Sequence, residues 1–364
     1  MPPVFATSLK ASPVLAFFMG RRRLRRVPLR PVWRGVAALG CAGVLAGCAQ
    51  GSTPQGARMN VRVPPGGPVA FTTEVPSDFH VHPLPGDGGV TLWALQRSER
   101  AAPLRYRVIV VPGSGCAGMG VMADRYFVGL LHAQVLVLHK PGVAPQARTT
   151  PADCAPGFVQ RDRLAAWLAH ARAALRADAS QRQGQPAVPQ LLVGISEGAE
   201  LLPALASEVP NLAGLVLVSA SGLDPQEAGA LQARRLGLEA DWRALGVLQA
   251  GHLPDTTVAQ GRSLGYWRDL WRWPVAQPLI DGPWPVLQVW GGEDALVPAA
   301  AYERFAQRMD QRAPLSWCVR RLDGADHGLQ HAGPAGGDGV QQVWAWTEQW
   351  ARAPQAGLCG PLRR

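Results

Sequence analysis

The stretch Leu191–Ala199 reads LLVGISEGA, an apolar run that ends in the pattern G-x-S-x-G and continues into residues compatible with a helix. A serine hydroxyl is a weak nucleophile, so it needs a tight strand-to-helix turn that presents it to a base and to a helix N-terminus. Gly194 and Gly198 suit such a turn, because a side chain at either position would crowd the backbone. The stretch therefore predicts a buried strand followed by a candidate nucleophile, Ser196. A Gly-rich turn with a surface serine is the alternative.

The first 47 residues have the composition of an export signal. They carry eight basic residues and no acidic residue, and they end in an apolar run from Gly35 to Gly47. This run of 13 residues is short for a membrane span, which needs about 20. The segment Leu45–Cys48 reads LAGC and resembles the lipobox of bacterial lipoproteins. That resemblance implies lipidation of Cys48, which would become the mature N-terminus.

A lipid on Cys48 would tether an exported protein to the periplasmic face of a membrane. Ala49 is not an acidic retention signal, so we expect the outer membrane. Met19 is an alternative start, because the basic segment would then have a normal length. An uncleaved anchor and plain secretion are the remaining alternatives.

The charge of the chain argues against nucleic acid as a partner. The formal charge is +10, and subtracting the eight positive charges of residues 1–47 leaves +2. A content of 47% hydrophobic and 17% charged residues is typical of a packed globule. After the signal, about 317 residues remain (364 minus 47), enough for one large α/β domain with an insertion or for two small domains. The oligomeric state is not indicated.

Beyond a Gly- and Pro-rich tether at residues 48–70, strands and helices alternate, which is typical of a mostly parallel sheet covered on both faces. The two earliest strands should be antiparallel. Strands are expected at 71–81, 89–96, 107–111, 134–138, 189–193 and 212–219, and helices from about 117 to 131, at 161–177 and at 199–207.

Four motifs in chain order resemble the α/β-hydrolase superfamily over roughly residues 70–352. They are the Gly-rich turn at 112–115, the G-x-S-x-G pattern, a strand and acidic loop at 285–298, and a histidine loop at 322–328. The resemblance implies an α/β fold, a mostly parallel doubly wound sheet of α/β-hydrolase type with a helical lid insertion. We expect a signal peptide over 1–47, a lipidated N-terminus and tether over 48–70, a core over 71–221 and 283–364, and the lid over 222–282.

The same resemblance implies a catalytic triad of Ser196, Asp294 and His327. His327 would accept the serine proton during attack on a carbonyl, and Asp294 would orient the imidazole. Glu293 is adjacent to Asp294 and is the competing carboxylate. His331 could be a surface residue or a secondary pocket group. The other histidines are expected to be structural: His80, His82, His132, His139, His170 and His252.

Two backbone donors should bind the oxyanion of an acyl-transfer reaction. The resemblance assigns them to the N–H groups of Glu197 and Ser114, with Pro112 in place of the histidine of the family's H-G-x-G turn. The side chain of Glu197 is expected to be a solvated carboxylate at a helix start, favoured by the helix dipole. Binding of a cationic substrate is the alternative role of this side chain.

Four cysteines remain after Cys48, and they permit two disulfides with three connectivities. The fold implied by the resemblance favours Cys116 with Cys154 and Cys318 with Cys359, because each pair would join neighbouring elements. Free buried thiols are the alternative. No paired Cys/His spacing suggests zinc, so we expect neither a metal nor a cofactor.

Residues 222–282 are too long for a plain loop in a compact domain, and 224–248 has a helical pattern. Four aromatics follow within eight positions, 266–273. Such a cluster either packs a helix onto the core or lines a substrate pocket through Tyr266, Trp267 and Trp271.

Together these patterns predict an exported, lipid-anchored serine hydrolase that forms an acyl-enzyme and acts on a carboxylic ester. A peptidase or an acyltransferase would use the same triad, so the substrate is a small molecule or a peptide. A non-catalytic binding lipoprotein is the alternative from another class, because fold does not determine function.

Overall fold

The computed structural model describes residues 77–149, 153–310, 312, 316–331 and 337–360. The expected signal peptide, the lipidation site Cys48 and the tether lie outside these residues. Within the described part, no helix combines the length and the apolar character needed to cross a bilayer.

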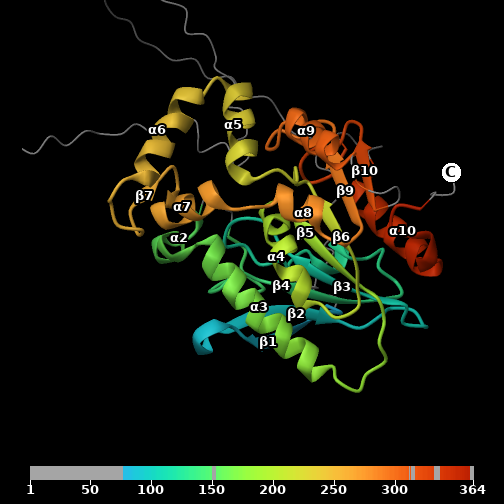
Figure 1. Cartoon of the computed structure of the whole chain (residues 1–364). Helices are drawn as coiled ribbons and strands as arrows, with labels where there is room; N and C mark the ends of the chain where they lie inside the picture. Colours follow the sequence, from blue (N-terminus) through green and yellow to red (C-terminus); the bar gives the residue numbers. More distant parts are fainter. Residues whose placement is uncertain (1–76, 150–152, 311, 313–315, 332–336, 361–364) are drawn as a thin grey trace, which may run out of the picture. The chain divides into compact units, whose positions relative to one another are not determined.

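A single eight-stranded sheet forms the centre of the described chain, in the order β1-β2-β4-β3-β5-β6-β9-β10 (Figure 1). β1 and β2 are antiparallel to their neighbours, and all the other pairs are parallel. The sheet is therefore mostly parallel, as the sequence predicted. The strands are β1 His80–Pro85, β2 Thr91–Arg97, β3 Tyr106–Val111, β4 Ala133–Leu138, β5 Gln190–Ile195, β6 Leu212–Val218, β9 Val286–Gly291 and β10 Trp317–Leu322.

The central strands are near-continuous apolar runs because both faces of the sheet are covered. In β3 every residue is buried, and alternate side chains join two different cores. Ile109 and Val111 belong to one core, while Val108 and Val110 belong to the other. The buried Arg107 on this strand is paired with Asp178, at 2.6 and 2.7 Å.

Helices cover both faces of the sheet. One core includes residues of α3 (Leu164–Gln181), α4 (Leu202–Leu205) and α9 (Ala299–Met309). The other includes residues of α1 (Ala123–Tyr126) and α10 (Gly339–Arg352). The sheet is thus doubly wound, as expected.

The chain between β6 and β9 forms a mostly helical insertion (Figure 1). The helix expected over 224–248 is two helices, because Gly237 has a φ of +69° and ends the first of them. The elements are α5 Pro225–Leu236, α6 Glu239–Ala250, the ribbon β7 Val258–Ala259 and β8 Arg262–Ser263, α7 Leu264–Arg272 and α8 Ala276–Asp281.

Several expected boundaries were wrong. Residues 77–79 of the strand expected at 71–81 do not belong to a strand, so the described strand begins at His80, while residues 71–76 lie outside the described part. The helix expected to reach residue 131 is only the four-residue α1. The helix expected at about 161–177 is α3, which begins at Leu164 because Asp162 and Arg163 are extended, and the short α2 (Pro156–Arg161) precedes it. The helix expected at 199–207 is a 3₁₀ helix, Ser196–Leu201, followed by the short α4.

Two disulfides are present, Cys116–Cys154 and Cys318–Cys359, with Cα–Cα distances of 5.6 and 5.4 Å. This is the connectivity favoured from the sequence. Cys318 lies on β10, and Cys359 follows α10. The second bond therefore ties the chain after the last helix to an edge strand of the sheet.

Removing the second disulfide should destabilise the fold. Its cysteines are 41 residues apart, and the chain-entropy model assigns a loop of this length about 4 kcal/mol. We expect the Cys318→Ser/Cys359→Ser variant to unfold at a lower temperature and lower urea concentration than the oxidised protein. Equal midpoints for the two proteins would contradict this prediction.

Candidate active site

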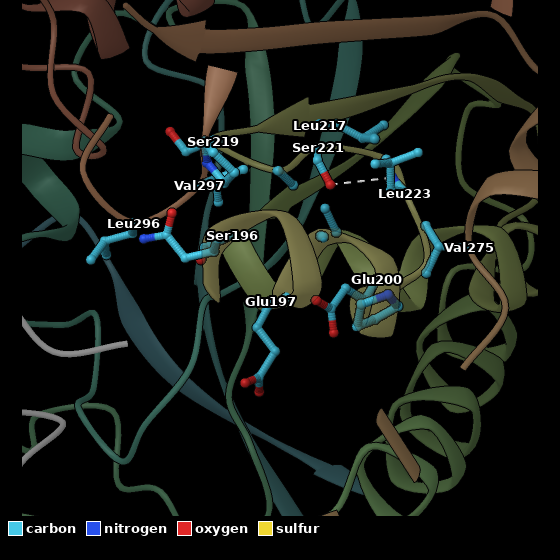
Figure 2. Close-up of a pocket in the computed structure, with 18 of the residues that line it drawn as sticks. Ser196, Glu197, Glu200, Leu217, Ser219, Ser221, Leu223, Val275, Leu296 and Val297 are labelled. Atoms are coloured by element: carbon cyan, nitrogen blue, oxygen red, sulfur yellow. Dashed lines mark hydrogen bonds between the residues drawn. The ribbon is translucent and has the colours of Figure 1, made fainter. Parts of the chain in front are cut away.

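The turn after β5 explains both glycines of the G-x-S-x-G pattern. A Cβ added at Gly194 would lie 2.3 Å from the Cα of Ala199, and one added at Gly198 would lie 2.1 Å from the main-chain oxygen of Val111. Ser196 itself has a φ of +51°, which is rare for a residue with a side chain. The backbone is therefore forced into a tight turn with Ser196 at its apex, beside a cavity (Figure 2).

The structure brings the three expected triad residues together. The Nε2 atom of His327 lies 3.1 Å from Ser196 Oγ, and its Nδ1 atom lies 2.9 Å from Asp294 Oδ2. The three residues follow β5, β9 and β10, so they meet where parallel strands present their carboxyl ends. The main-chain oxygen of His327 also accepts a hydrogen bond of 2.6 Å from Ser219 Oγ.

Asp294, not Glu293, contacts the histidine. Glu293 is exposed, whereas Asp294 is buried and accepts hydrogen bonds from the N–H groups of Leu296 (2.8 Å) and Val297 (2.9 Å). Tyr302 also donates its hydroxyl to Asp294 Oδ2, at 2.8 Å. Burial raises the pKa of Asp294, but the contact with His327 and the two N–H groups outweigh it and leave the pKa below its usual range. The carboxylate is thus ionised and fixed in orientation.

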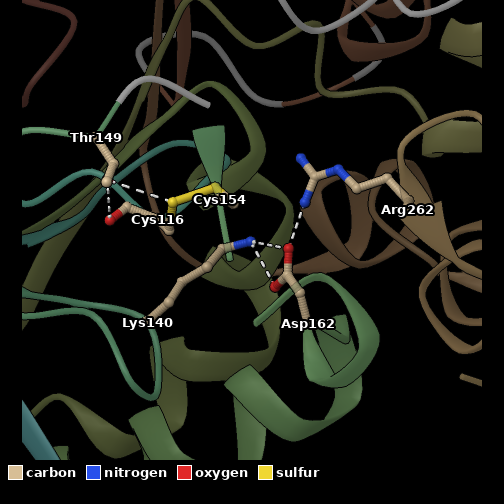
Figure 3. Close-up of a disulfide and its surroundings, with 6 residues drawn as sticks. All are labelled: Cys116, Lys140, Thr149, Cys154, Asp162 and Arg262. Atoms are coloured by element: carbon tan, nitrogen blue, oxygen red, sulfur yellow. Dashed lines mark hydrogen bonds and ion pairs between the residues drawn. A yellow bond between two sulfur atoms is a disulfide. The ribbon is translucent and has the colours of Figure 1, made fainter. Parts of the chain in front are cut away.

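The turn expected to supply an oxyanion donor passes beside the serine. A Cβ added at Gly113, the residue before Ser114, would lie 3.4 Å from Ser196 Cβ. The Cys116–Cys154 disulfide and a 2.9 Å hydrogen bond from Thr149 Oγ1 to the Cys116 main-chain oxygen hold the end of this turn (Figure 3).

The side chain of Glu197 is neither solvated nor free to bind a substrate, so both of its expected roles were wrong. Only 2% of the residue is exposed. Its carboxylate forms an ion pair with Lys140, a second one with Arg262 at 3.3 Å, and accepts the hydroxyl of Tyr266 at 2.7 Å. The carboxylate therefore has a structural role, because it connects three side chains, one from the core and two from the insertion.

Glu197 belongs to a buried network of four charges. Asp162 pairs with Lys140 at 2.9 Å and also with Arg262 (Figure 3). Together with Glu197, the network therefore has two cations and two anions. The network joins the end of β4, the break between α2 and α3, the Ser196 turn and strand β8 of the insertion. Burial raises the pKa of Glu197, but the charges of Lys140 and Arg262 outweigh it and hold the pKa below its ordinary value.

A cavity beside Ser196 is closed on one side by the insertion. Trp242, Leu270 and Val275 line it from the insertion, and Leu217 and Leu296 line it from the core. Leu270 lies on α7 with the aromatic cluster, so the sequence indicated the right helix but not the face that lines the cavity. Trp242 and Val275 lie outside the cluster, and no sequence pattern marked them as cavity residues.

The expected pocket residues Tyr266, Trp267 and Trp271 do not line this cavity. Tyr266 and Trp267 are fully buried, and Trp271 stacks on Trp242 with ring centroids 4.4 Å apart. The aromatic cluster therefore packs the insertion onto the core, which is the first of the two roles expected from the sequence.

His139 and His331 lie outside the cavity lining. His139 Nε2 accepts the N–H of Met119 at 3.0 Å, and burial lowers its pKa to about 4, so the ring is neutral and structural. His331 Nδ1 contacts the main-chain oxygen of Gly337 at 2.8 Å. Across the described ranges, no group of three or more His, Cys, Asp or Glu side chains is arranged to hold a metal ion.

The Glu197→Gln variant should be less stable than the wild type by about 3–5 kcal/mol at pH 7, because two buried cations lose part of their compensation. The pKa of Glu197 is lowered on folding, so its stabilisation is complete above the ordinary value of 4.5 and is lost as the pH falls through the folded value. The difference in unfolding free energy should therefore shrink towards low pH. Urea titrations from pH 7 to pH 3 measure it, with the exposed Glu303→Gln as control; a constant difference would refute the idea.

No family model matches this chain, and no curated protein matches it in sequence. Solved structures share its fold. Est1E from Butyrivibrio proteoclasticus with bound ferulic acid is 18% identical, with 76% of this chain and 99% of that chain covered and a TM-score of 0.52. A Staphylococcus aureus protein of unknown function is 14% identical, with 75% and 98% covered and a TM-score of 0.50. Together with the strand order and the Ser196 turn, these likenesses show that the chain has the α/β-hydrolase fold.

Proposed function

We propose that this protein is an exported serine hydrolase that cleaves an acyl bond, with a carboxylic ester as its substrate, through an acyl-enzyme on Ser196. One observation carries the proposal: an unbroken line of hydrogen bonds from Ser196 through His327 to the buried Asp294, at the edge of a mostly apolar cavity. This arrangement supplies a nucleophile, a base and the group that orients the base.

The proposed reaction begins with attack of Ser196 Oγ on the ester carbonyl carbon. With Nδ1–H donated to Asp294, Nε2 of His327 is free to accept the serine proton. The resulting imidazolium is stabilised by the Asp294 carboxylate. Its Nε2 proton then passes to the alkoxide oxygen as the C–O bond breaks, and the alcohol leaves. Water repeats the sequence on the acyl-enzyme and releases the carboxylic acid.

The oxyanion of each tetrahedral intermediate needs fixed donors. The N–H of Glu197 directly follows the nucleophile, and the N–H of Ser114 lies in the turn that passes beside it. The buried ion pairs of the Glu197 side chain hold the first donor in place. The Cys116–Cys154 disulfide restrains the second. Both supports reduce the reorganisation needed during the reaction.

Export with a lipid on Cys48 is part of the proposal. The two disulfides support it, because such bonds persist in oxidising compartments such as the periplasm. The basic segment, the apolar run and the LAGC sequence at residues 45–48 are the remaining support.

Ser196→Ala should abolish labelling by a fluorophosphonate probe and hydrolysis of p-nitrophenyl esters, while the melting temperature stays close to that of the wild type. His327→Ala should reduce turnover about as much, since triad members act as a unit. The exposed Ser98→Ala is the matched control and should label normally. Labelling of folded Ser196→Ala would place the nucleophile elsewhere. A folded wild type that neither labels nor hydrolyses esters or aminoacyl amides would indicate the non-catalytic binder.

Asp294→Asn should lower kcat by up to about 10⁴, because an amide favours the wrong histidine tautomer. Glu293→Gln should leave kcat close to the wild-type value, since Glu293 is exposed and Asp294 is the carboxylate that contacts His327. Steady-state kinetics on one ester measure both effects. A large loss in Glu293→Gln with full activity in Asp294→Asn would reverse the assignment.

A further inference from the structure

Glu200 is a carboxyl group in the cavity for which the proposed mechanism has no use. It lies on the 3₁₀ helix Ser196–Leu201, one turn beyond the serine, and lines the same cavity as Ser196 (Figure 2). Its Oε2 atom is shielded from solvent and has no hydrogen-bond partner among the described residues. Its main-chain oxygen accepts the indole N–H of Trp273 at 2.9 Å, which fixes the backbone at this point.

The charged and titratable groups around Glu200 are Glu197 on its own helix, Lys140 after β4, Arg262 on β8 and Tyr266 on α7. Both cations already bind Glu197 and Asp162, and the hydroxyl of Tyr266 is donated to Glu197. An ionised Glu200 would therefore add an unbalanced negative charge. Burial and the charge of Glu197 raise its pKa well above the usual range. Both effects favour the neutral carboxyl, which can donate a hydrogen bond.

The other polar side chains of the cavity lining already have contacts within the protein. Five polar side chains other than Ser196 and Glu200 line the cavity, and all of them make contacts within the protein; the fifth, Trp242, stacks on Trp271. Glu197 lies in its network, Ser219 donates to His327, Ser221 accepts the N–H of Leu223, and Gln232 both donates to Ala295 and accepts from Arg235. Glu200 is thus a carboxyl group in this lining with an oxygen that no described residue satisfies.

We propose that Glu200 determines specificity by donating a hydrogen bond to an uncharged oxygen, such as a ketone, ether or hydroxyl oxygen, on the substrate chain that fills this cavity. The inference rests on the proposed hydrolase function and narrows its substrate class. A substrate chain without such an oxygen fills the cavity and leaves the carboxyl of Glu200 unpartnered, which a site of this kind penalises strongly.

The test compares p-nitrophenyl pentanoate with p-nitrophenyl 4-oxopentanoate and 4-methoxybutanoate, each rate being divided by that of uncatalysed hydrolysis. A parallel series carries the same chains on the alcohol side of acetate esters. In at least one series, kcat/KM of the wild type should favour the oxygen-bearing chains by about tenfold or more. The 4-trimethylammoniobutanoyl ester tests the competing idea that an ionised Glu200 pairs with a cation.

Two variants separate hydrogen bonding from packing. In Glu200→Leu the preference should fall to about one, because the donor is gone. In Glu200→Gln most of the preference should remain, because the amide still donates. The exposed Glu303→Gln is the matched control and should keep the wild-type preference. Circular dichroism and fluorophosphonate labelling verify that each variant is folded and has a reactive serine.

The pH dependence of the preference gives an independent readout. The wild-type ratio of the two kcat/KM values should fall as the pH rises through the raised pKa of Glu200, since the carboxylate cannot donate. The ratio in Glu200→Gln should be constant over the same range. Because titration of the triad affects both substrates, it cancels in the ratio.

Three results would overturn the proposal: a wild-type ratio near one in both series, a ratio that survives in Glu200→Leu, or a preference for the ammonium ester that Glu200→Gln abolishes. In each case hydrolysis of the plain pentanoate with labelling at Ser196 would leave the proposed function intact. Absence of labelling and of all ester hydrolysis would remove both.

Discussion

The structure depends on how closely the Ser196 turn packs against the end of β3. There is no room for a side chain at Gly194 or Gly198, and Ser196 is held in a left-handed conformation that costs about 1–3 kcal/mol elsewhere. This close approach places the chain that follows β3, including Gly113, beside the serine. The serine and the turn with the second candidate oxyanion donor are therefore positioned by one backbone contact.

The residue after the serine connects this turn to the insertion. Glu197 extends into the network of Lys140, Asp162 and Arg262, while Ser196 lines the cavity. Because Arg262 lies on β8, the position of the insertion over the cavity depends on a charge pair with the turn itself. Breaking a buried pair of this kind is far more damaging than losing a surface one. Stability of the insertion and placement of a candidate oxyanion donor thus share the same ion pairs.

The features that could be predicted from sequence are those with local or ordered signals. The central strands are apolar runs that can be recognised locally. The motifs of Ser196, Asp294 and His327 follow one another in the chain order of the fold, and the three side chains do meet in the structure. The network could not be predicted, because Glu197 lies 57 residues from Lys140 and 65 from Arg262, and each looks like an ordinary surface charge in the sequence. The aromatic cluster of α7 was ambiguous for another reason: spacing shows that a helix has an apolar face but does not show whether that face meets the core or a cavity.

Two carboxyl groups three residues apart on one turn have opposite states. Glu197 faces two cations that lower its pKa and favour the ionised form, whereas Glu200 lines the cavity, where burial and the charge of Glu197 raise its pKa and favour the neutral form. The first state favours the second, since the charge of Glu197 disfavours another negative charge nearby, and the cations are already bound. A neutral Glu200 in turn keeps the cavity free of net charge, which suits the uncharged ester that Ser196 is proposed to attack. The ion pairs of Lys140 and Arg262 with Glu197 therefore have two effects: they hold the Ser196 turn in place, and they favour a cavity lining without net charge.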